Sequence, residues 1–266
     1  MERIRVAVDM ARHRQLLPAR PRGWAPSGKG WNDGRVPYTR TVRFVLDEEF
    51  VRERRVVPGT DDDATTNSYR MLRTQVLRKL KENGWNVLAV TSPRRGAGKS
   101  LTALNLAFSL AQDLNQTVLL VDADLREPTI HRYLGYEPAL GLSDYLRDRV
   151  PLERLLVNPN VERLVVLPGR ESVANSSEML ASARMRDLVQ ELKRRYADRV
   201  VVFDVPALLD SDDALAFSPN VDALLLVVRE GRTRKADVTR AVSVIEGVPL
   251  LGTVLNDASE PWGRER

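Results

Sequence analysis

A lysine and a serine follow two closely spaced glycines in the segment S-P-R-R-G-A-G-K-S, residues 92–100, and these residue types suit the binding of phosphate groups. Gly96 and Gly98 let the backbone approach a phosphate with its N–H groups turned inward. Lys99 could reach the β- and γ-phosphate oxygens of a triphosphate, and the Ser100 hydroxyl could ligate Mg²⁺. The segment therefore predicts a triphosphate-binding loop, although a proline replaces the first glycine of the pattern G-x-x-x-x-G-K-[ST].

Three aspartates follow apolar runs further along the chain. Asp122 and Asp124 come after the run V-L-L-V, and Asp204 comes after V-V-V-F. Because the carboxyl ends of parallel strands lie at one edge of a sheet, we expect these carboxylates to converge with Lys99. Two carboxylates about 4 Å apart repel each other by roughly 4 kcal/mol at an effective dielectric constant of about 20, and a bound Mg²⁺ would remove that repulsion. The alternative is that each aspartate caps a loop.

Apolar runs and helical periodicities predict the elements that would position these side chains. Apolar residues recur at helical spacing between Ser68 and Gly84, and a capping box of Asn175 and Glu178 would begin a later helix. Strands are predicted at 86–91, 117–121, 163–167, 200–203, 223–228 and 250–255, and further helices at 100–114, 178–196 and 233–246. Short apolar strands that alternate with helices predict an α/β fold with a mostly parallel central sheet flanked by helices.

The first 60 residues differ from the rest of the chain in composition. They contain 13 Lys and Arg residues against 7 Asp and Glu residues, a net charge of +6, whereas the whole chain carries +5. Four prolines and four glycines in the middle of this region resist a packed core. We predict a basic, flexible N-terminal arm over residues 1–60 and a folded domain over residues 61–266. The arm is either a solvated tail or a contact for an acidic partner or an anionic membrane surface, assisted by Arg52, Arg54 and Arg55.

Several classes of protein are disfavoured by composition. The chain contains no cysteine and only two histidines, which excludes a disulfide framework, a thiolate metal site and an iron–sulfur cluster. The apolar runs are far shorter than the roughly 20 residues that span a bilayer, and the N-terminus lacks the apolar core of a signal peptide. We therefore expect a soluble protein of a reducing compartment, most simply the cytoplasm.

Taken together, these segments resemble the bacterial tyrosine kinase (BY-kinase) family of capsule and exopolysaccharide production. That family belongs to the P-loop class shared with the MinD and ParA ATPases. Thr91–Ser100 resembles its Walker A motif, Val118–Arg126 its Walker A′ motif, Val201–Pro206 its Walker B motif, and Gly252–Asn256 its last core strand. The resemblance runs from Ser68 to Asn256 and implies a Rossmann-like P-loop NTPase sandwich with ATP and Mg²⁺ as cofactors.

The resemblance also implies a role for each matching position. Lys99, Asp122, Asp124 and Asp204 would be catalytic, with Asp122 taking the proton from the attacking hydroxyl. The nucleotide would be bound by Arg95, Gly96, Ala97, Gly98, Lys99, Ser100 and Leu101, and by Asn256 near the adenine. The metal would be held by Ser100, Asp122 and Asp204, with Asp124 and Asp204 positioning it directly or through water.

The resembling family implies an ATP-dependent protein-tyrosine kinase, or a kinase-like regulator, of capsular or exopolysaccharide polymerisation and export. Its partner would be the cytoplasmic segment of a membrane polysaccharide co-polymerase, and the chain would lie in the cytoplasm or peripherally at the inner face of the cell membrane. A homo-oligomer fits the family, and no nucleic acid is expected as a partner. Two alternatives stay open: a MinD/ParA-type ATPase switch, and a nucleotide-gated scaffold that transfers nothing.

The chain departs from the family pattern at three places. In the family, one helix carries the motif Glu-x-x-Arg-x-x-Arg, through which subunits assemble into a ring. The matching positions here are Asn67, Arg70 and Arg73, so the acidic residue is missing and ring assembly through this helix is in doubt. The alternative is that Arg70 and Arg73 belong to a solvated helical face. Alanine replaces the usual second proline after the Walker B motif. A C-terminal tyrosine cluster is missing, since the last tyrosine is Tyr196, so Tyr38 on the arm is the candidate phosphate acceptor.

Two arginines near the predicted site each have two interpretations. Arg94 falls where MinD and ParA proteins place a signature lysine, so it is either an arginine finger or a solvent-facing charge. Arg126 follows the Walker A′ aspartates and either neutralises charge near the nucleotide or forms an ion pair with a carboxylate of the core.

Overall fold

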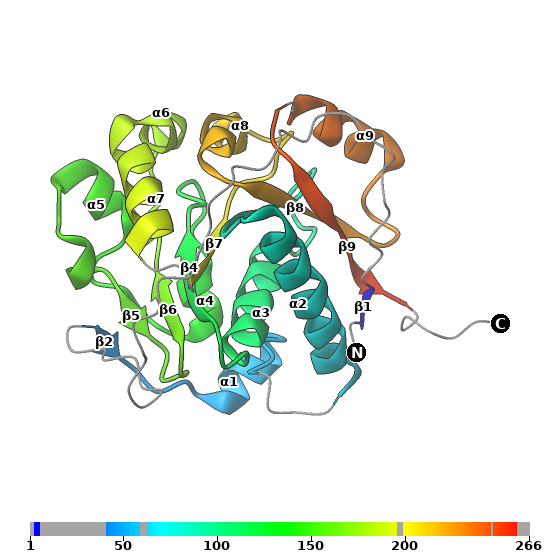
Figure 1. Ribbon diagram of the computed structural model, residues 1–266, viewed down its shortest axis with the longest axis horizontal. Helices are drawn as coiled ribbons and strands as arrows, with labels where there is room; N and C mark the ends of the chain where they lie inside the picture. Colours follow the sequence, from blue (N-terminus) through cyan, green and yellow to red (C-terminus); the bar gives the residue numbers. More distant parts are fainter. Residues whose placement is uncertain (1–2, 6–40, 59–62, 196–198, 246, 260–266) are drawn as a thin grey trace.

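The computed structural model describes residues 3–5, 41–58, 63–195, 199–245 and 247–259. Within these residues a single sheet of nine strands crosses the molecule in the order β1-β9-β8-β3-β7-β4-β6-β5-β2 (Figure 1). The strands from β9 to β6 in this order are parallel, whereas β1 runs antiparallel to β9 and β5 runs antiparallel to β6. The predicted α/β fold with a mostly parallel sheet is confirmed.

The six parallel strands coincide with the six predicted apolar runs. They are β3 (Val87–Thr91), β4 (Thr117–Asp122), β6 (Leu164–Leu167), β7 (Arg199–Asp204), β8 (Ala223–Arg229) and β9 (Leu250–Ala258). Three short strands lie toward the two edges of the sheet: β1 (Arg3–Arg5), β2 (Val42–Arg43) and β5 (Val157–Asn158). The short strands are absent from the prediction because two or three residues carry no recognisable period.

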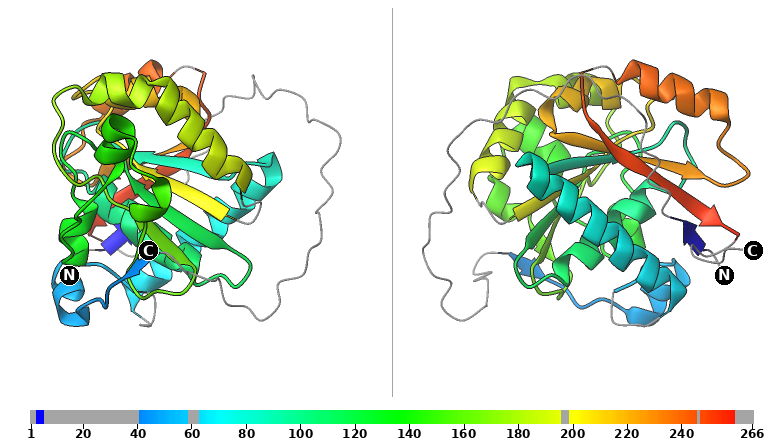
Figure 2. Two further views of the ribbon diagram at one scale, coloured as in Figure 1. Left: turned by 90° about the vertical axis from the view of Figure 1, so that its left-hand side faces the viewer. Right: turned by 45° about the vertical axis from the view of Figure 1, so that its right-hand side comes forward.

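Helices cover both faces of the sheet (Figures 1 and 2). One face is covered by α1 (Glu48–Glu53), α2 (Ala64–Asn83), α3 (Lys99–Ala111) and α4 (Ile130–Leu134). The other face is covered by α5 (Leu142–Asp148), the 3-10 turn η1 (Leu152–Arg154), α6 (Ser176–Ala181), α7 (Ala183–Arg195), α8 (Asp213–Phe217), the 3-10 turn η2 (Ser218–Asn220) and α9 (Lys235–Val244). The sheet is therefore buried between two helical layers.

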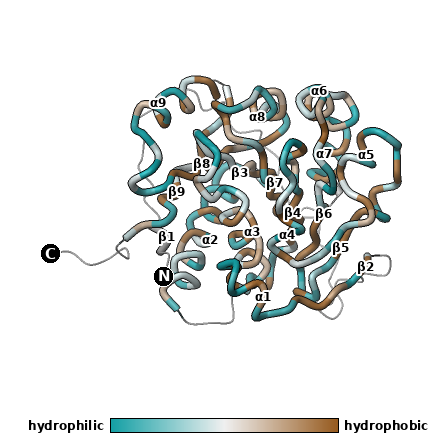
Figure 3. The backbone as a smooth tube through the Cα atoms, turned by 180° about the vertical axis from the view of Figure 1, so that it is seen from behind, coloured by the Kyte–Doolittle hydropathy of each residue, from teal (hydrophilic) through white to brown (hydrophobic). Residues whose placement is uncertain are grey.

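Alternate side chains of each central strand build two separate cores. In β3, Leu88 and Val90 pack against α2 and α3, whereas Val87 and Ala89 pack against the opposite layer, and all four side chains are fully buried. Hydrophobic residues accordingly follow the strands in Figure 3. Because both faces of a central strand are buried, polar side chains on these strands are confined to their ends. This arrangement concentrates the polar chemistry at the carboxyl edge of the sheet.

One predicted helix is divided in two. The helix expected at 178–196 forms α6 and α7, which are separated at Ser182, where the backbone is extended with ψ at 154°. The Ser182 hydroxyl accepts a hydrogen bond from Met185 N at 3.1 Å and so caps the start of α7. Asn175 occupies the N-cap position of α6 without a side-chain capping bond, so the predicted capping box is wrong. The serine cap inside the run competes with a continuous helix.

Part of the predicted N-terminal arm is folded against the domain. Residues 41–58 contain β2 and α1, and Val51 of α1 is fully buried. The Asn105 side chain of α3 holds this segment, since its Oδ1 accepts from Val57 N at 2.8 Å and its Nδ2 donates to Arg55 O at 3.0 Å. The prediction that the flexible arm extends to residue 60 is therefore wrong for this segment, because the average composition concealed a local apolar pattern.

The remainder of that arm, residues 6–40 with the candidate acceptor Tyr38, lies outside the described residues. In the described part of the chain, no helix combines the length and the hydropathy that crossing a bilayer requires. The helix α2 reaches 20 residues, but charged residues interrupt its apolar positions.

Candidate active site

The carboxyl edge of the sheet gathers the residues that the sequence singled out. The predicted phosphate loop, residues 92–98, joins β3 to α3, and Lys99 and Ser100 begin α3. Asp122 ends β4 and Asp204 ends β7, and these two residues are directly opposite each other on adjacent strands. Side chains from three separate strand ends therefore lie together, as expected for a parallel sheet.

Lys99 lies among the three carboxylates. Its Nζ is 2.7 Å from Asp124 Oδ2 and 3.4 Å from Asp204 Oδ1, and it also lies 3.1 Å from Ser100 Oγ. Burial alone would lower the pKa of Lys99, but the carboxylates of Asp204 and Asp124 outweigh burial and raise that pKa. Lys99 is therefore an ammonium ion at neutral pH, fixed at the point where the strand ends meet.

Asp122 and Asp204 each retain an oxygen without a partner in the described part of the chain. Asp122 Oδ2 accepts from the backbone N–H groups of Thr129 and Ile130 at 2.9 and 3.0 Å, whereas its Oδ1 has no hydrogen bond. Asp204 Oδ2 also has no hydrogen bond, although both side chains are fully buried. Burial raises the pKa of Asp122 well above its ordinary value, and the Asp204 charge raises it further; burial also raises the pKa of Asp204, which Lys99 partly offsets.

These two oxygens fit a divalent cation. A buried carboxylate oxygen without a donor is costly unless a cation or a proton satisfies it. The described residues contain no group of three or more His, Cys, Asp or Glu side chains that could hold a metal by themselves. Mg²⁺ at a nucleotide site needs only one or two protein carboxylates, because phosphate oxygens and water complete its shell. The donor set of Ser100, Asp122 and Asp204 matches that chemistry.

The loop itself is shaped for an anion. Gly96 and Gly98 have φ values of 78° and 89°, a region that side-chain-bearing residues seldom adopt. A Cβ atom at Gly98 would lie 2.1 Å from Asn256 Nδ2, so the close approach of β9 also requires glycine. Gly98 is the N-cap of α3 and no side chain caps this end, so the first backbone N–H groups of α3 are available to phosphate oxygens. Asn256 Nδ2 donates to Ala97 O at 2.9 Å, which ties the loop to β9.

A carboxylate that the sequence analysis missed braces the other half of the loop. Asp210 accepts from Arg94 Nη1 at 2.9 Å and from Arg95 N at 2.8 Å. The segment that contains Asp210 follows the Walker B aspartate, and its residues Leu208 and Leu209 donate backbone hydrogen bonds to the loop at 2.9 and 3.1 Å. Arg94 also lies 3.4 Å from a carboxylate oxygen of Asp237 in α9, so its side chain is paired within the chain rather than simply exposed to solvent.

An arginine at the end of β8 supports the loop from a third direction. Arg229 Nε lies 2.6 Å from Asp257 Oδ2, and Arg229 Nη1 donates to Gly96 O at 3.3 Å. Asp257 has a φ of 58° and lies directly after Asn256. The signal that could have identified Arg229 is its place at the carboxyl end of a buried strand, the same rule that identified the aspartates.

The side chains of the other predicted residues, Arg95, Leu101 and Arg126, point away from the centre of the site or pair with other residues. The exposed Arg95 side chain lies 3.3 Å from Glu127 Oε2, and Leu101 packs partly buried against the core of α2 and α3, so only the backbone of Leu101 belongs to the loop. Arg126 Nε lies 2.5 Å from the buried Asp213 carboxylate. The structure therefore confirms the interpretation in which Arg126 forms an ion pair with a carboxylate of the core.

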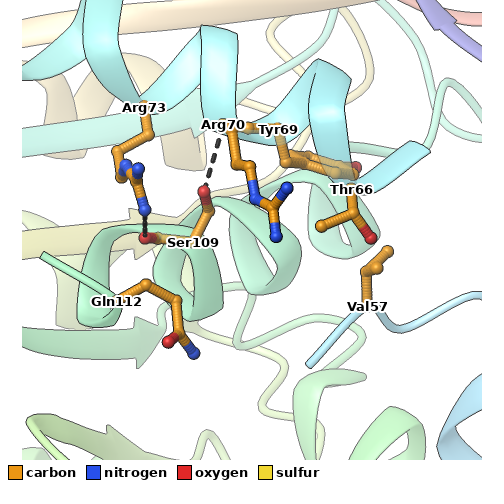
Figure 4. A pocket seen from close by; sticks show the side chains of 7 residues that line it. All are labelled: Val57, Thr66, Tyr69, Arg70, Arg73, Ser109 and Gln112. Atoms are coloured by element: carbon orange, nitrogen blue, oxygen red, sulfur yellow. Dashed lines mark hydrogen bonds between the residues drawn. The ribbon is translucent and has the colours of Figure 1, made fainter. Parts of the chain in front are cut away.

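The helix that departs from the family motif lines a separate hollow between α2 and α3 (Figure 4). Arg70 donates to Asn67 Oδ1 at 3.0 Å, and Arg73 donates to Ser109 O at 2.9 Å. Arg73 is therefore bound to α3, and the interpretation of this face as merely solvated is wrong at that position. The hollow contains none of the residues of the carboxyl edge.

Comparisons with known proteins agree with this geometry. A family model described as ParA: NUBPL iron-transfer P-loop NTPase matches residues 84–259. The tyrosine-protein kinase YwqD of Bacillus subtilis (strain 168) is 32% identical over 207 residues, which cover 77% of this chain and 86% of that protein. The tyrosine-protein kinase ptk of Acinetobacter johnsonii is 30% identical over 198 residues, and the chain spans only 27% of that longer protein.

A solved structure shares the architecture. The kinase domain of Escherichia coli tyrosine kinase ETK is 26% identical and superposes with a TM-score of 0.71, covering 90% of this chain and 100% of that domain. The Walker A, Walker A′ and Walker B segments thus lie on the strand ends that the family resemblance requires. This chain belongs to the bacterial tyrosine kinase family within the ParA-type P-loop NTPases.

Proposed function

We propose that the chain transfers the γ-phosphoryl group of ATP to a tyrosine hydroxyl of a protein. The observation that carries this proposal is the meeting of Lys99, Asp122, Asp124 and Asp204 at one sheet edge, beside the uncapped start of α3. The family supplies the reaction class, since relatives of this chain are named tyrosine-protein kinases. The geometry supports the proposal, since Lys99 could stabilise the phosphate charge and Asp122 could accept the hydroxyl proton.

ATP would bind with its phosphates against the backbone of residues 95–101 and with its adenine near Asn256. Lys99 would contact the β- and γ-phosphate oxygens, which requires it to exchange part of its contact with Asp124. Mg²⁺, held by Ser100, Asp122 and Asp204, would neutralise charge on the phosphate oxygens. The positive end of α3 adds a fixed favourable potential that needs no reorganisation during the reaction.

Transfer of the γ-phosphoryl group to tyrosine requires a residue of this chain to accept the hydroxyl proton. A bond forms between the tyrosine oxygen and the γ-phosphorus, while the bond from that phosphorus to the bridging oxygen of ADP breaks. The hydroxyl proton would go to Asp122, the carboxylate to which the family resemblance gives this role. Asp122 is held in place by the N–H groups of Thr129 and Ile130, so its orientation is fixed before the substrate arrives.

We also propose that the kinase acts in capsular or exopolysaccharide polymerisation and export, with a membrane co-polymerase as its partner. The resemblance to the family supports this setting, which would bring the chain to the inner face of the cell membrane. The cytoplasmic segment of the co-polymerase would then be an activator or a substrate of the kinase.

The test is to incubate the purified chain with γ-labelled ATP and Mg²⁺, with and without a co-polymerase cytoplasmic segment. Label on tyrosine supports a kinase. Release of free phosphate without labelled tyrosine would replace the proposal with an ATPase switch, and neither product would indicate a scaffold. Peptide mapping of the labelled chain then tests Tyr38, because absence of phosphate at that residue removes it as the acceptor.

A further inference from the structure

We propose that four exposed cations in α9 and in the loop just before it form a docking surface for the acidic residues that flank the target tyrosine. The surface consists of Arg232, Arg234, Lys235 and Arg240, and it is called the α9 basic surface below. The inference rests on the proposed kinase function and adds to it the class of protein substrate, an acidic polypeptide segment.

The four side chains are exposed and free of intramolecular partners in the part of the chain that the structure describes. They lie within a stretch of nine residues, 232–240, whereas many other cations of this molecule are engaged in ion pairs, such as Arg126 with Asp213 and Arg147 with Glu171. A cluster of like charges without counterions raises the local positive potential and attracts anionic groups.

The nearby acidic residues do not neutralise this surface. Asp237 lies in the first turn of α9, but its carboxylate faces Arg94 of the phosphate loop at 3.4 Å. The Glu230 carboxylate accepts a hydrogen bond from Ser259 N at 2.5 Å. Arg234 is the N-cap and Lys235 the first residue of α9, where the helix dipole is also positive. Cations are unfavourable at that position unless an anion joins them.

The α9 basic surface adjoins the proposed phosphoryl-transfer site. The loop that carries its first residues follows β8, whose last residue, Arg229, donates to Gly96 O of the phosphate loop at 3.3 Å. The Arg94–Asp237 ion pair links the same phosphate loop to the first turn of α9. In Figure 1, α9 lies above β8 and beside the beginning of β9, away from α1 and β2. A peptide with its tyrosine at the site can therefore extend across this surface.

The observations favour a peptide over a membrane as the occupant. A helix that lies in a membrane interface needs a continuous apolar face beside its cations. In α9 the large exposed apolar side chains are Val242 and Val244, at 38% and 37% exposure, and both lie at the far end of the helix from Arg234 and Lys235. A flat bilayer against this surface would also cover the edge at which the substrate hydroxyl must enter.

The experiment measures binding and transfer separately. A fluorescent peptide with one tyrosine flanked by glutamates is compared with the same peptide carrying glutamines, using fluorescence anisotropy at low and high salt and a tyrosine phosphorylation assay. The full chain is compared with the double variant Arg234→Glu, Lys235→Glu, in which the new carboxylates suit the N-terminus of α9 and so preserve the helix. ATP hydrolysis without peptide is recorded for each protein.

The matched control is the double variant Lys81→Glu, Arg154→Glu, which makes the same change in net charge at two other exposed positions. Lys81 lies near the end of α2, just before the amino end of β3, and so at the opposite end of that strand from the phosphate loop. We expect the chain to prefer the glutamate peptide about tenfold at low salt, with the preference lost in the α9 variant, kept in the control and weakened by salt. Peptide-free ATP hydrolysis is expected to stay unchanged in the α9 variant.

Equal binding of both peptides, or an equal loss in the α9 variant and the control, would overturn the α9 basic surface as a docking site. Capture by phosphatidylglycerol vesicles that the α9 variant alone loses, without a preference for the glutamate peptide, would identify a membrane contact instead and equally overturn the proposal. If ATP is not hydrolysed and no tyrosine is labelled while the glutamate peptide still binds selectively, the proposed kinase function fails and the docking surface stands.

Discussion

At the scale of single residues, the site depends on one largely buried cation, Lys99, among three carboxylates. Lys99 compensates charge on Asp124 and Asp204. Asp122 relies on two backbone N–H groups, and its other oxygen has no donor among the residues that the structure describes. This balance stores unfavourable electrostatic energy in the free protein. Binding of a metal-bound triphosphate would release that energy, which favours a site that is ready for its ligand before the ligand arrives.

Substituting Lys99→Met should abolish measurable ATP turnover, because the cation that stabilises charge on the γ-phosphoryl group is removed. Loss of one such contact typically lowers kcat by about 10²- to 10³-fold. Phosphate release measures the effect, and circular dichroism verifies that the variant is folded. Lys99→Arg is the control that keeps the ion pairs, and unchanged turnover in Lys99→Met would contradict the role given to this residue.

Substituting Asp122→Asn should stabilise the fold while removing transfer to tyrosine. The asparagine oxygen can still accept from the N–H groups of Thr129 and Ile130, and the buried charge is lost. Since the pKa of Asp122 is raised in the folded state, the wild-type chain loses stability as pH rises above the ordinary aspartate pKa of about 4. The advantage of the variant should therefore grow from pH 4 toward neutrality.

Thermal unfolding of both proteins across that pH range provides the measurement. A gain of about 1 kcal/mol corresponds to a rise in Tm of about 2–4 °C for a domain of this size. A variant that is less stable than the wild type at neutral pH would show that the Asp122 charge is compensated in the free protein, contrary to this account.

At the scale of elements, the phosphate loop is held by three segments distant in sequence. The segment after β7 supplies Asp210, the end of β8 supplies Arg229, and the end of β9 supplies Asn256. Each of them bonds to the loop backbone, so the loop conformation is set by tertiary contacts as well as by its glycines. A movement of the segment after β7 would therefore shift the loop backbone that is proposed to contact the phosphates.

Substituting Asp210→Asn should raise the KM for ATP several-fold with a smaller change in kcat. The amide oxygen can still accept from one donor, but the charge that pairs with Arg94 is lost and the loop loses part of its support. Steady-state kinetics with varied ATP provides the measurement. The control is Glu127→Gln, since the half-exposed Glu127 side chain pairs with the exposed side chain of Arg95 and such a surface pair contributes little. Equal effects of the two substitutions would argue against a brace at Asp210.

The elements of the fold were predictable where burial imposes a pattern. The parallel strands read as unbroken apolar runs because both of their faces are covered, and the phosphate loop is recognisable because its backbone demands glycine. The break at Ser182 was not predictable in this way, since one serine cap decides between one helix and two. Local hydrogen bonds of this kind leave no periodic trace in the sequence.

The central residues of the candidate site could be predicted from the sequence, whereas the residues that hold the phosphate loop in place could not. Lys99, Asp122 and Asp204 belong to short motifs with fixed spacing, so their meeting followed from the parallel sheet. Asp210 lies in an irregular segment, and its two bonds to the loop depend on how that segment folds back. Such supporting contacts arise from tertiary packing, which spacing along the chain does not encode.

At the scale of the whole molecule, residues 41–58 are part of the folded unit. Substituting Val51→Ala should destabilise the entire domain by about 1–3 kcal/mol, because a fully buried side chain is truncated. Val45→Ala is the matched control, since Val45 is 81% exposed and such a surface change usually costs less than about 0.5 kcal/mol. Urea unfolding followed by fluorescence compares the two, and an equal effect would contradict the packing of α1.

The strands β1 and β2 stand at opposite ends of the sheet order, although both come from the first 43 residues of the chain. The beginning of the polypeptide thus closes both margins of the sheet, where unpaired backbone groups would otherwise invite association between molecules. A chain shortened to start after β2 would leave β9 and β5 as edge strands with unpaired backbone groups. Such a chain would self-associate before it lost catalytic activity.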